Sequence, residues 1–222
     1  KQYAKSIGAT FVMFERDDMY ENFLKKYPQM SEYDAVNLYK IFILEYLAES
    51  YDLILYLDFD VFCRKHIDIF NTLDCSTFLR CQNSSAMELG IKNTLVYYAK
   101  FDHDFRNPES KYWNTHALLD DYGLDNYRTC VFNTGIIAAS SSCIKQLDFF
   151  TDLDKILGVM TELKEDEDCM YPANIQKSFG YDNETIFAFK IVANNVNHRG
   201  LNDQWHYKHY AGNAISPRLS DK

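Results

Sequence analysis

The chain has 222 residues, of which 32 are Asp or Glu and 23 are Lys or Arg, so its formal net charge is -9. An acidic chain without a basic stripe repels polyanions, which argues against nucleic acid as a partner. Hydrophobic residues make up 47% of the sequence, enough for one sizeable core, yet no apolar run approaches the roughly 20 residues of a membrane span.

The N-terminal part is predicted to contain a helix end, a strand and a longer helix. Residues 1–7 have the character of the end of a helix, with Gly8 as its C-cap. The run Thr-Phe-Val-Met-Phe at residues 10–14 is typical of a strand. The sequence Ser-Glu-Tyr-Asp at residues 31–34 resembles a capping box and predicts a helix that runs to about Ser50.

Lys40 lies in the apolar stripe of that helix. The other members of the stripe recur at helical spacing and are Val36, Tyr39, Ile43, Leu44 and Leu47. A lysine in such a position usually extends its ammonium group to solvent. The alternative is that Lys40 anchors a phosphate or a sugar hydroxyl.

The next predicted strand is the apolar run 53–57, which leads into Asp58, Phe59, Asp60 and Val61. A short apolar run fits a buried parallel strand better than a helix. In an extended chain side chains alternate between faces, so we expect Asp58 and Asp60 to point the same way. Ligands bind at the carboxyl ends of strands in open α/β sheets. Two carboxylates there predict a site for Mg²⁺ or Mn²⁺, and a solvated turn is the alternative.

Two later segments place polar groups near the ends of predicted elements. The strand predicted at 130–139 contains Asn133 and Gly135, and a glycine inside a strand marks either a close approach by a ligand or a bulge. Asp182 stands at the start of a predicted helix over residues 184–192. It is a good N-cap residue, and as a cap it needs no further function.

Near the end of the chain, His206 and His209 precede Gly212. Histidine is the commonest metal ligand in proteins, although either residue could equally be a surface histidine. The acidic run at residues 165–168 is expected to be a solvated loop.

The six cysteines show no C-x-x-C spacing and are Cys63, Cys75, Cys81, Cys130, Cys143 and Cys169. The spacing therefore indicates neither a zinc site nor a small disulfide scaffold. We expect a reducing, cytoplasmic setting, with an anchor or a further domain outside this chain left open.

Taken in chain order, these segments resemble the GT-A glycosyltransferases. The resemblance is closest to family eight, which includes glycogenin and bacterial galactosyltransferases. That pattern has a lysine or arginine in the helix before the strand, a Y-L-D-x-D-V strand, an F-N-x-G strand, a D-Q-D-like helix start and a late H-x-x-G. The matching residues here are Lys40, 56–61, 132–135, 182–184 and 209–212.

The resemblance implies an α/β fold, namely a single GT-A domain of the Rossmann-like nucleotide-diphospho-sugar transferase type. Its sheet would be mixed, mostly parallel and flanked by helices. We expect residues 1–222 to be one glycosyltransferase catalytic domain that lacks its first strand.

The resemblance also implies a function. The chain would be a hexosyl- or pentosyltransferase that depends on Mn²⁺ or Mg²⁺. It would move a sugar from a nucleotide-sugar donor, a UDP-sugar before others, to a hydroxyl of a carbohydrate or glycoprotein acceptor, with retention of configuration.

Residue roles follow from the same resemblance. The metal ligands would be Asp58, Asp60 and His209, and Asp58 would also contact the ribose. The donor-binding residues would be Lys40, Asp58, Asn133, Gly135 and Gly212. Asp182 and Asn183 would be catalytic, Asp182 holding the donor sugar and Asn183 lying near the reacting carbon.

The chain departs from the family pattern in two places. Asn183 replaces the usual glutamine. The family's Lys-Pro-Trp after H-x-x-G is missing, and only Lys208, Pro217 and Arg218 lie nearby.

Three other interpretations stay open from the sequence. Residues 58–61 also resemble the nucleophile motif of haloacid-dehalogenase-like phosphatases, in which one Asp is phosphorylated and the other is the acid/base. That family requires a later apolar strand that ends in paired aspartates. The acidic run 165–168 has no such strand before it. A catalytically silent nucleotide-sugar-binding domain would share the transferase motifs. Finally, some aromatic side chains are hypothesised to stack on the sugar rings of the acceptor, although they could equally be core residues or a subunit contact. They are Tyr97, Tyr98, Tyr112 and Trp113.

Overall fold

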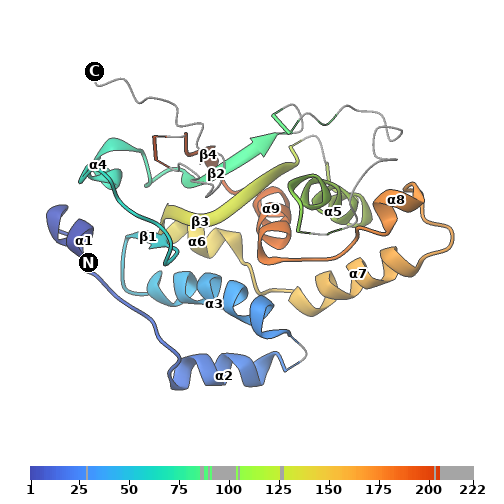
Figure 1. Ribbon diagram of the computed structural model, residues 1–222, viewed down its shortest axis with the longest axis horizontal. Helices are drawn as coiled ribbons and strands as arrows, with labels where there is room; N and C mark the ends of the chain where they lie inside the picture. The colour runs from blue at the N-terminus through green and yellow to red at the C-terminus, as the bar shows by residue number, and fades with distance from the viewer. Residues whose placement is uncertain are drawn as a thin grey trace, which may run out of the picture.

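A computed structural model describes residues 1–28, 30–85, 88–89, 91, 104, 106–125, 128–202 and 204–205. Within these residues, helices surround a four-stranded sheet (Figure 1). The strands are β1 (Leu53–Leu57), β2 (Leu79–Ser85), β3 (Cys130–Ser140) and β4 (His198–Gly200), in the order β1-β3-β2-β4. The predicted α/β class, with a mixed sheet flanked by helices, is confirmed.

The direction of β3 corrects one detail of the prediction. β3 pairs antiparallel with both β1 and β2, and the parallel pairing that the structure describes is the one between β2 and β4. The described part of the sheet is therefore not mostly parallel. An apolar strand indicates burial by helices on its faces, and such burial does not by itself fix the direction of the neighbouring strand.

The helices cover the sheet and one another. α5 and α9 pack side by side against β3, and α3 and α6 pack together beside β1 and β3 (Figure 1). The described helices are α1 (Gln2–Ser6), α2 (Asp18–Lys26), α3 (Glu32–Leu47), α4 (Ile69–Thr72), α5 (Pro108–Asp121), α6 (Ser141–Leu147), α7 (Leu153–Glu165), α8 (Ala173–Gln176) and α9 (Asn183–Ala193).

The two faces of β3 bury cores of different size. Ile137 belongs to the large core, which also contains fully buried Phe149 and Phe187. Its neighbour Ala138 belongs to a small cluster with Ile69 and Cys75. Successive side chains of a strand point to opposite faces, so these two neighbours mark the two sides of the sheet.

Most predicted elements are present. Ser31 caps α3 by accepting a hydrogen bond from the Asp34 amide at 3.1 Å, as the capping box predicts. Gly8 follows α1 with φ of +69°, as expected at a helix C-terminus. β3 and α9 match the strand and helix predicted at 130–139 and 184–192.

The strand predicted at residues 10–14 is wrong. These residues are irregular, and Phe11, Val12 and Met13 are 43% to 58% exposed. A β-prone run becomes a strand only where another backbone pairs with it, and no described segment does so here.

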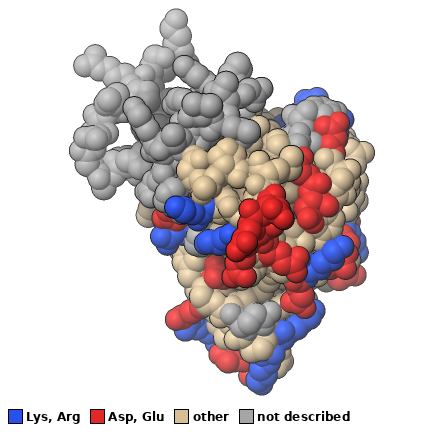
Figure 2. Space-filling model, turned by 90° about the vertical axis from the view of Figure 1, so that its right-hand side faces the viewer, with Lys and Arg blue, Asp and Glu red and all other residues tan. Residues whose placement is uncertain are grey.

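The acidic composition is visible on the surface. Residues 165–168 are exposed at the end of α7, as expected of a solvated run. Figure 2 shows Asp and Glu side chains gathered on the face that lies to the right in Figure 1, where α7 and α8 are found. No helix in the part of the chain that the structure describes is long and apolar enough to cross a membrane.

Candidate active site

The D-x-D segment forms a turn. β1 ends at Leu57, and the amide of Val61 donates a hydrogen bond to the carbonyl oxygen of Asp58 at 3.2 Å, which closes the turn. The expectation of an extended chain through Asp60 is therefore wrong, and strand alternation does not orient the two carboxylates. Phe59 and Asp60 are exposed, whereas the Asp58 side chain is 34% exposed.

Lys40 and Tyr56 meet the Asp58 carboxylate beneath this turn. The Lys40 Nζ lies 3.7 Å from Asp58 Oδ1, and the Tyr56 hydroxyl donates to the same oxygen at 2.7 Å. Lys40 is only 7% exposed, so its ammonium group does not extend to solvent as such lysines usually do. We call Lys40, Tyr56, Asp58 and Asp60 the Asp58 cluster.

The pKa of Tyr56 is raised by burial and by the two carboxylates of the turn. Burial raises this pKa first, and the negative charges of Asp58 and then of Asp60 raise it further. Tyr56 therefore stays protonated and keeps donating to Asp58.

The Asp58 cluster suits a hard divalent cation. Its acceptors are carboxylate oxygens, the ligands that Mg²⁺ and Mn²⁺ prefer. Asp60 forms no ion pair with any residue in the described ranges, so its carboxylate is available. Among the described residues no group of three Asp, Glu, His or Cys side chains is placed to hold a metal. The third predicted ligand, His209, lies outside the described residues, as does Gly212.

A bulge in β3 brings the next motif to the same place. The pairing of β3 with β2 jumps from Ile137 opposite Cys81 to Asn133 opposite Gln82, which leaves the intervening β3 residues without β2 partners. The carbonyl oxygen of Gly135 instead accepts the amide of Asp58 at 2.9 Å. The bulge interpretation of Gly135 is thus confirmed.

The Asn133 side chain folds back onto the same bulge. Its Oδ1 accepts the amide of Gly135 at 3.2 Å. Asn133 is half-buried, and its predicted contact with the donor stays a prediction.

The first turn of α9 forms a second charged cluster. Lys111 Nζ, from α5, lies 2.8 Å from Asp182 Oδ2 and 2.5 Å from Glu184 Oε2. Glu184 Oε1 accepts the amide of Thr134 at 2.9 Å, and Asn183 Nδ2 donates to Thr134 Oγ1 at 2.7 Å. We call Lys111, Thr134, Asp182, Asn183 and Glu184 the Lys111 cluster.

This second cluster is closed. Asp182 is 4% exposed and Asn183 6% exposed. Burial disfavours the charge of Lys111, but Asp182 and Glu184 outweigh it, so the pKa of Lys111 is raised and the ammonium stays charged. Asp182 also accepts the amide of Thr185 at 2.8 Å, which confirms its interpretation as the cap of α9.

Thr134 and Gly135 join the two clusters, because the end of β1 is bonded to one residue and the start of α9 to the other. Sequence reasoning anticipated that the motifs meet, but it missed Lys111 and Glu184 as partners. No local signal could have identified Lys111, which stands in a polar helix 73 residues from Glu184.

The acceptor hypothesis is corrected for Tyr112 and Trp113. They are 8% and 7% exposed and their rings pack in the large core, which is the alternative that the sequence left open. Tyr97 and Tyr98 lie outside the described residues.

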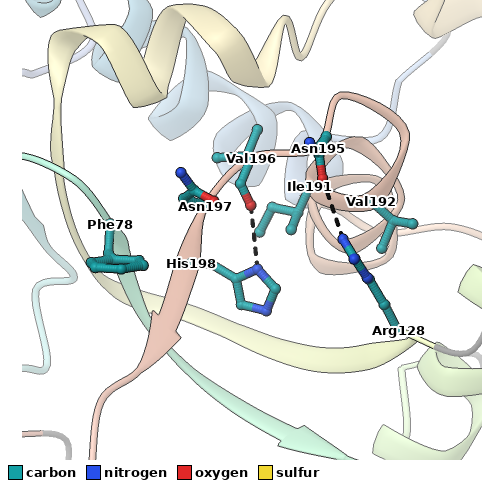
Figure 3. Close-up of a pocket in the computed structure, with 8 residues that line it drawn as sticks. All are labelled: Phe78, Arg128, Ile191, Val192, Asn195, Val196, Asn197 and His198. Carbon is teal, nitrogen blue, oxygen red and sulfur yellow. Dashed lines mark hydrogen bonds between the residues drawn. The ribbon is translucent and has the colours of Figure 1, made fainter.

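A cavity of about 240 Å³ lies away from both clusters. Figure 3 shows it between Phe78, just before β2, and the C-terminal end of α9, with Arg128 bonded to Asn195 at 3.2 Å. β1 and β2 both run antiparallel to β3, so they start at the same end of the sheet. The start of β2 therefore lies at the end of the sheet opposite to Asp58, which follows the last residue of β1. The cavity therefore contributes nothing to the site.

The sequence matches the model of a known protein family. The model of the family described as Glycosyl transferase family 8 matches residues 1–150, which include Lys40, the D-x-D turn and the bulge of β3. No curated protein matches the chain, and no solved structure does.

Proposed function

We propose that this chain, which belongs to glycosyl transferase family 8, transfers a sugar from a nucleotide-sugar donor to a hydroxyl acceptor with the help of a divalent metal ion. Membership makes the chain a glycosyltransferase, with a sugar donor and an acceptor. It sets aside the phosphatase, and the turnover test below separates the enzyme from a silent binding domain of the same family. Metal dependence, the UDP-sugar donor, the carbohydrate or glycoprotein acceptor and retention of configuration are the finer parts of the proposal.

One observation carries the proposal. Three segments that lie far apart in the sequence meet here: the D-x-D turn, the bulge of β3 and the start of α9. The turn is hydrogen-bonded to Gly135 of the bulge, and Asn183 and Glu184 of α9 are hydrogen-bonded to Thr134 of the bulge. A site assembled from a strand end, a bulge and a helix start suits ligand binding, because bulges are common where side chains must be re-aimed.

Asp58, Asp60 and His209 are the residues that would hold the metal. A bound Mn²⁺ or Mg²⁺ would neutralise charge that develops on the departing diphosphate. Lys40 adds a fixed positive charge beside Asp58, where it would orient that carboxylate and attract the donor's phosphates.

Asp182 and Asn183 would hold the donor sugar. Both oxygens of Asp182 already accept one hydrogen bond, but each carboxylate oxygen has a second lone pair for a sugar hydroxyl. Asn183 donates its amide to Thr134, so its carbonyl oxygen remains an acceptor. Asn133, Gly135 and Gly212 complete the proposed donor site.

Retention of configuration is the stereochemical part of the proposal. In a front-side reaction the leaving diphosphate accepts the proton of the acceptor hydroxyl, so the protein needs to position groups rather than supply a base. The carboxylates described here are engaged with lysines or lie in the exposed turn, which fits holding and charge stabilisation.

The test is turnover of a panel of nucleotide sugars, measured with Mn²⁺ and with EDTA. Simple sugars are supplied as acceptors, and water acts as the acceptor where none of them is used. We expect Mn²⁺-dependent transfer or slow donor hydrolysis. Proton NMR of the first-formed product should show the anomeric configuration of the donor. An inverted centre would overturn retention, and activity that survives EDTA would overturn metal dependence.

A further inference from the structure

We infer that Lys111 is a positioning residue for sugar transfer, which holds the Asp182 carboxylate charged and fixed toward the donor. This inference rests on the proposed function of Asp182. The observation behind it is that one buried ammonium group binds two carboxylates of the same helix turn, at 2.8 Å and 2.5 Å.

The two carboxylates need this cation. Asp182 and Glu184 stand two residues apart at the start of α9, and their side chains are 5% and 14% exposed. Two close, buried negative charges repel each other, and without a cation one of them takes up a proton. A protonated Asp182 would have a hydrogen-bond donor in place of one acceptor, so it would accept fewer hydrogen bonds from sugar hydroxyls.

Few other charges surround Lys111. Hydrogen bonds from Arg106, the shortest at 3.0 Å, lower the pKa of Asp104, and the charge of Lys111 lowers it by a smaller amount. β3 contributes the neutral Thr134. Within the described residues, the charge of Asp182 and Glu184 is therefore compensated by Lys111, helped by the positive N-terminal end of α9.

Lys111 also ties the helix start to the strand. Glu184 receives Lys111 on one oxygen and the Thr134 amide on the other. That amide belongs to the β3 bulge, so α5, α9 and β3 are joined at one carboxylate. Lys111 and the Thr134 amide thereby hold the Glu184 carboxylate from both sides.

The first experiment is Lys111→Met, an uncharged side chain of similar length. We expect kcat for the nucleotide sugar that the wild type uses best to fall by about 100-fold at pH 7, as for other misplaced catalytic groups. Binding of UDP with Mn²⁺, which involves no sugar, should change less than about twofold. Lys111→Arg keeps the charge and should restore part of kcat.

The pH profile separates positioning from packing. In Lys111→Met the acid limb of kcat should move to higher pH, because the uncompensated carboxylates bind protons more readily. In Glu184→Gln it should move to lower pH, because a repelling charge is gone while Lys111 remains. A packing role would lower kcat equally at every pH. If Lys111→Met does not fold, Lys111→Arg and Glu184→Gln still decide.

Lys190→Met is the matched control. Lys190 is also buried in α9, at 5% exposure, but its Nζ donates to the carbonyl oxygens of Asp148 and Thr151 at 2.7 Å and 2.6 Å. We expect its acid limb to match the wild type. A wild type that turns over no nucleotide sugar would overturn the proposed function and this inference together. An active wild type whose kcat and acid limb are both unchanged in Lys111→Met, or whose acid limb is unchanged in Glu184→Gln where Lys111→Met does not fold, would overturn the inference alone.

Discussion

The Asp58 cluster and the Lys111 cluster each combine one lysine with two carboxylates spaced two residues apart, yet they differ in how far the charges are satisfied. In the first, Lys40 lies 3.7 Å from Asp58, and Asp60 is exposed without an ion pair among the described residues. In the second, Lys111 lies within 2.8 Å of both carboxylates.

The difference comes from where each pair stands. Asp58 and Asp60 occupy the turn that follows β1, a strand at the edge of the described sheet, where side chains reach solvent. Asp182 and Glu184 occupy a helix start packed against α5 and β3. An exposed carboxylate keeps lone pairs for a ligand, whereas a buried one must be paired within the protein. We therefore assign ligand binding mainly to the Asp58 cluster and positioning mainly to the Lys111 cluster.

The largest effect is expected at Asp60. Asp60→Asn removes one ligand charge without changing volume, and the exposed turn should leave the fold intact. The Kd of UDP in the presence of Mn²⁺ should rise by roughly 100-fold or more. Loss of a ligand should weaken binding more than loss of a residue that only contacts a ligand, which usually lowers metal affinity by about 10-fold to 100-fold. Calorimetry with and without Mn²⁺ measures this.

Glu167→Gln is the control for Asp60→Asn, since Glu167 is an exposed acid in the loop after α7 and should have no effect. Unchanged Mn²⁺-dependent affinity in a folded Asp60→Asn variant would remove Asp60 from the ligand set.

The histidines test the same cluster from outside the described residues. His209→Ala should weaken Mn²⁺ binding by roughly 10-fold to 100-fold, and His206→Ala much less, because only His209 has the H-x-x-G spacing. One Mn²⁺ titration series with both variants decides. Equal and small effects would make both residues ordinary surface histidines.

Asp182→Asn tests the closed cluster. Asn is an equally good cap, so α9 keeps its start, but the charged bond with Lys111 is weakened at a cost of about 1 to 2 kcal/mol in unfolding free energy. Turnover should fall by about 10-fold or more as the hold on donor hydroxyls loosens. Urea unfolding and donor hydrolysis measure the two effects.

Asp17→Asn is the control, because Asp17 caps α2 through the amides of Met19 and Tyr20, and no lysine pairs with it in the described ranges. Neither stability nor turnover should change there. The comparison of the clusters fails if Asp182→Asn behaves like Asp17→Asn.

The smallest effect is expected at Lys40. Lys40→Met should weaken Mn²⁺-dependent UDP binding by about 10-fold, the worth of one charge-assisted contact. Stability should hold, since an apolar side chain of similar length avoids the cost of burying an ammonium group. Calorimetry and thermal unfolding together check this, and a large loss of stability would make Lys40 a structural residue instead.

Much of the local structure was predictable from the sequence. The capping box at Ser31, the cap at Asp182 and the glycine after α1 depend on hydrogen bonds or backbone angles within a few residues, so the local sequence specifies them. The strand predicted at 10–14 failed for the opposite reason, because a strand needs a partner from elsewhere.

The sequence by itself determined which residues can carry charge, metal or sugar at each strand and helix end, and it indicated the family. The tertiary structure decided that D-x-D lies in a turn, that Gly135 sits in a bulge and that Lys111 pairs with residues more than 70 positions away. Local patterns record which bonds a residue can make. Which of them form depends on burial and on the partner brought alongside, and both arise only when the chain folds.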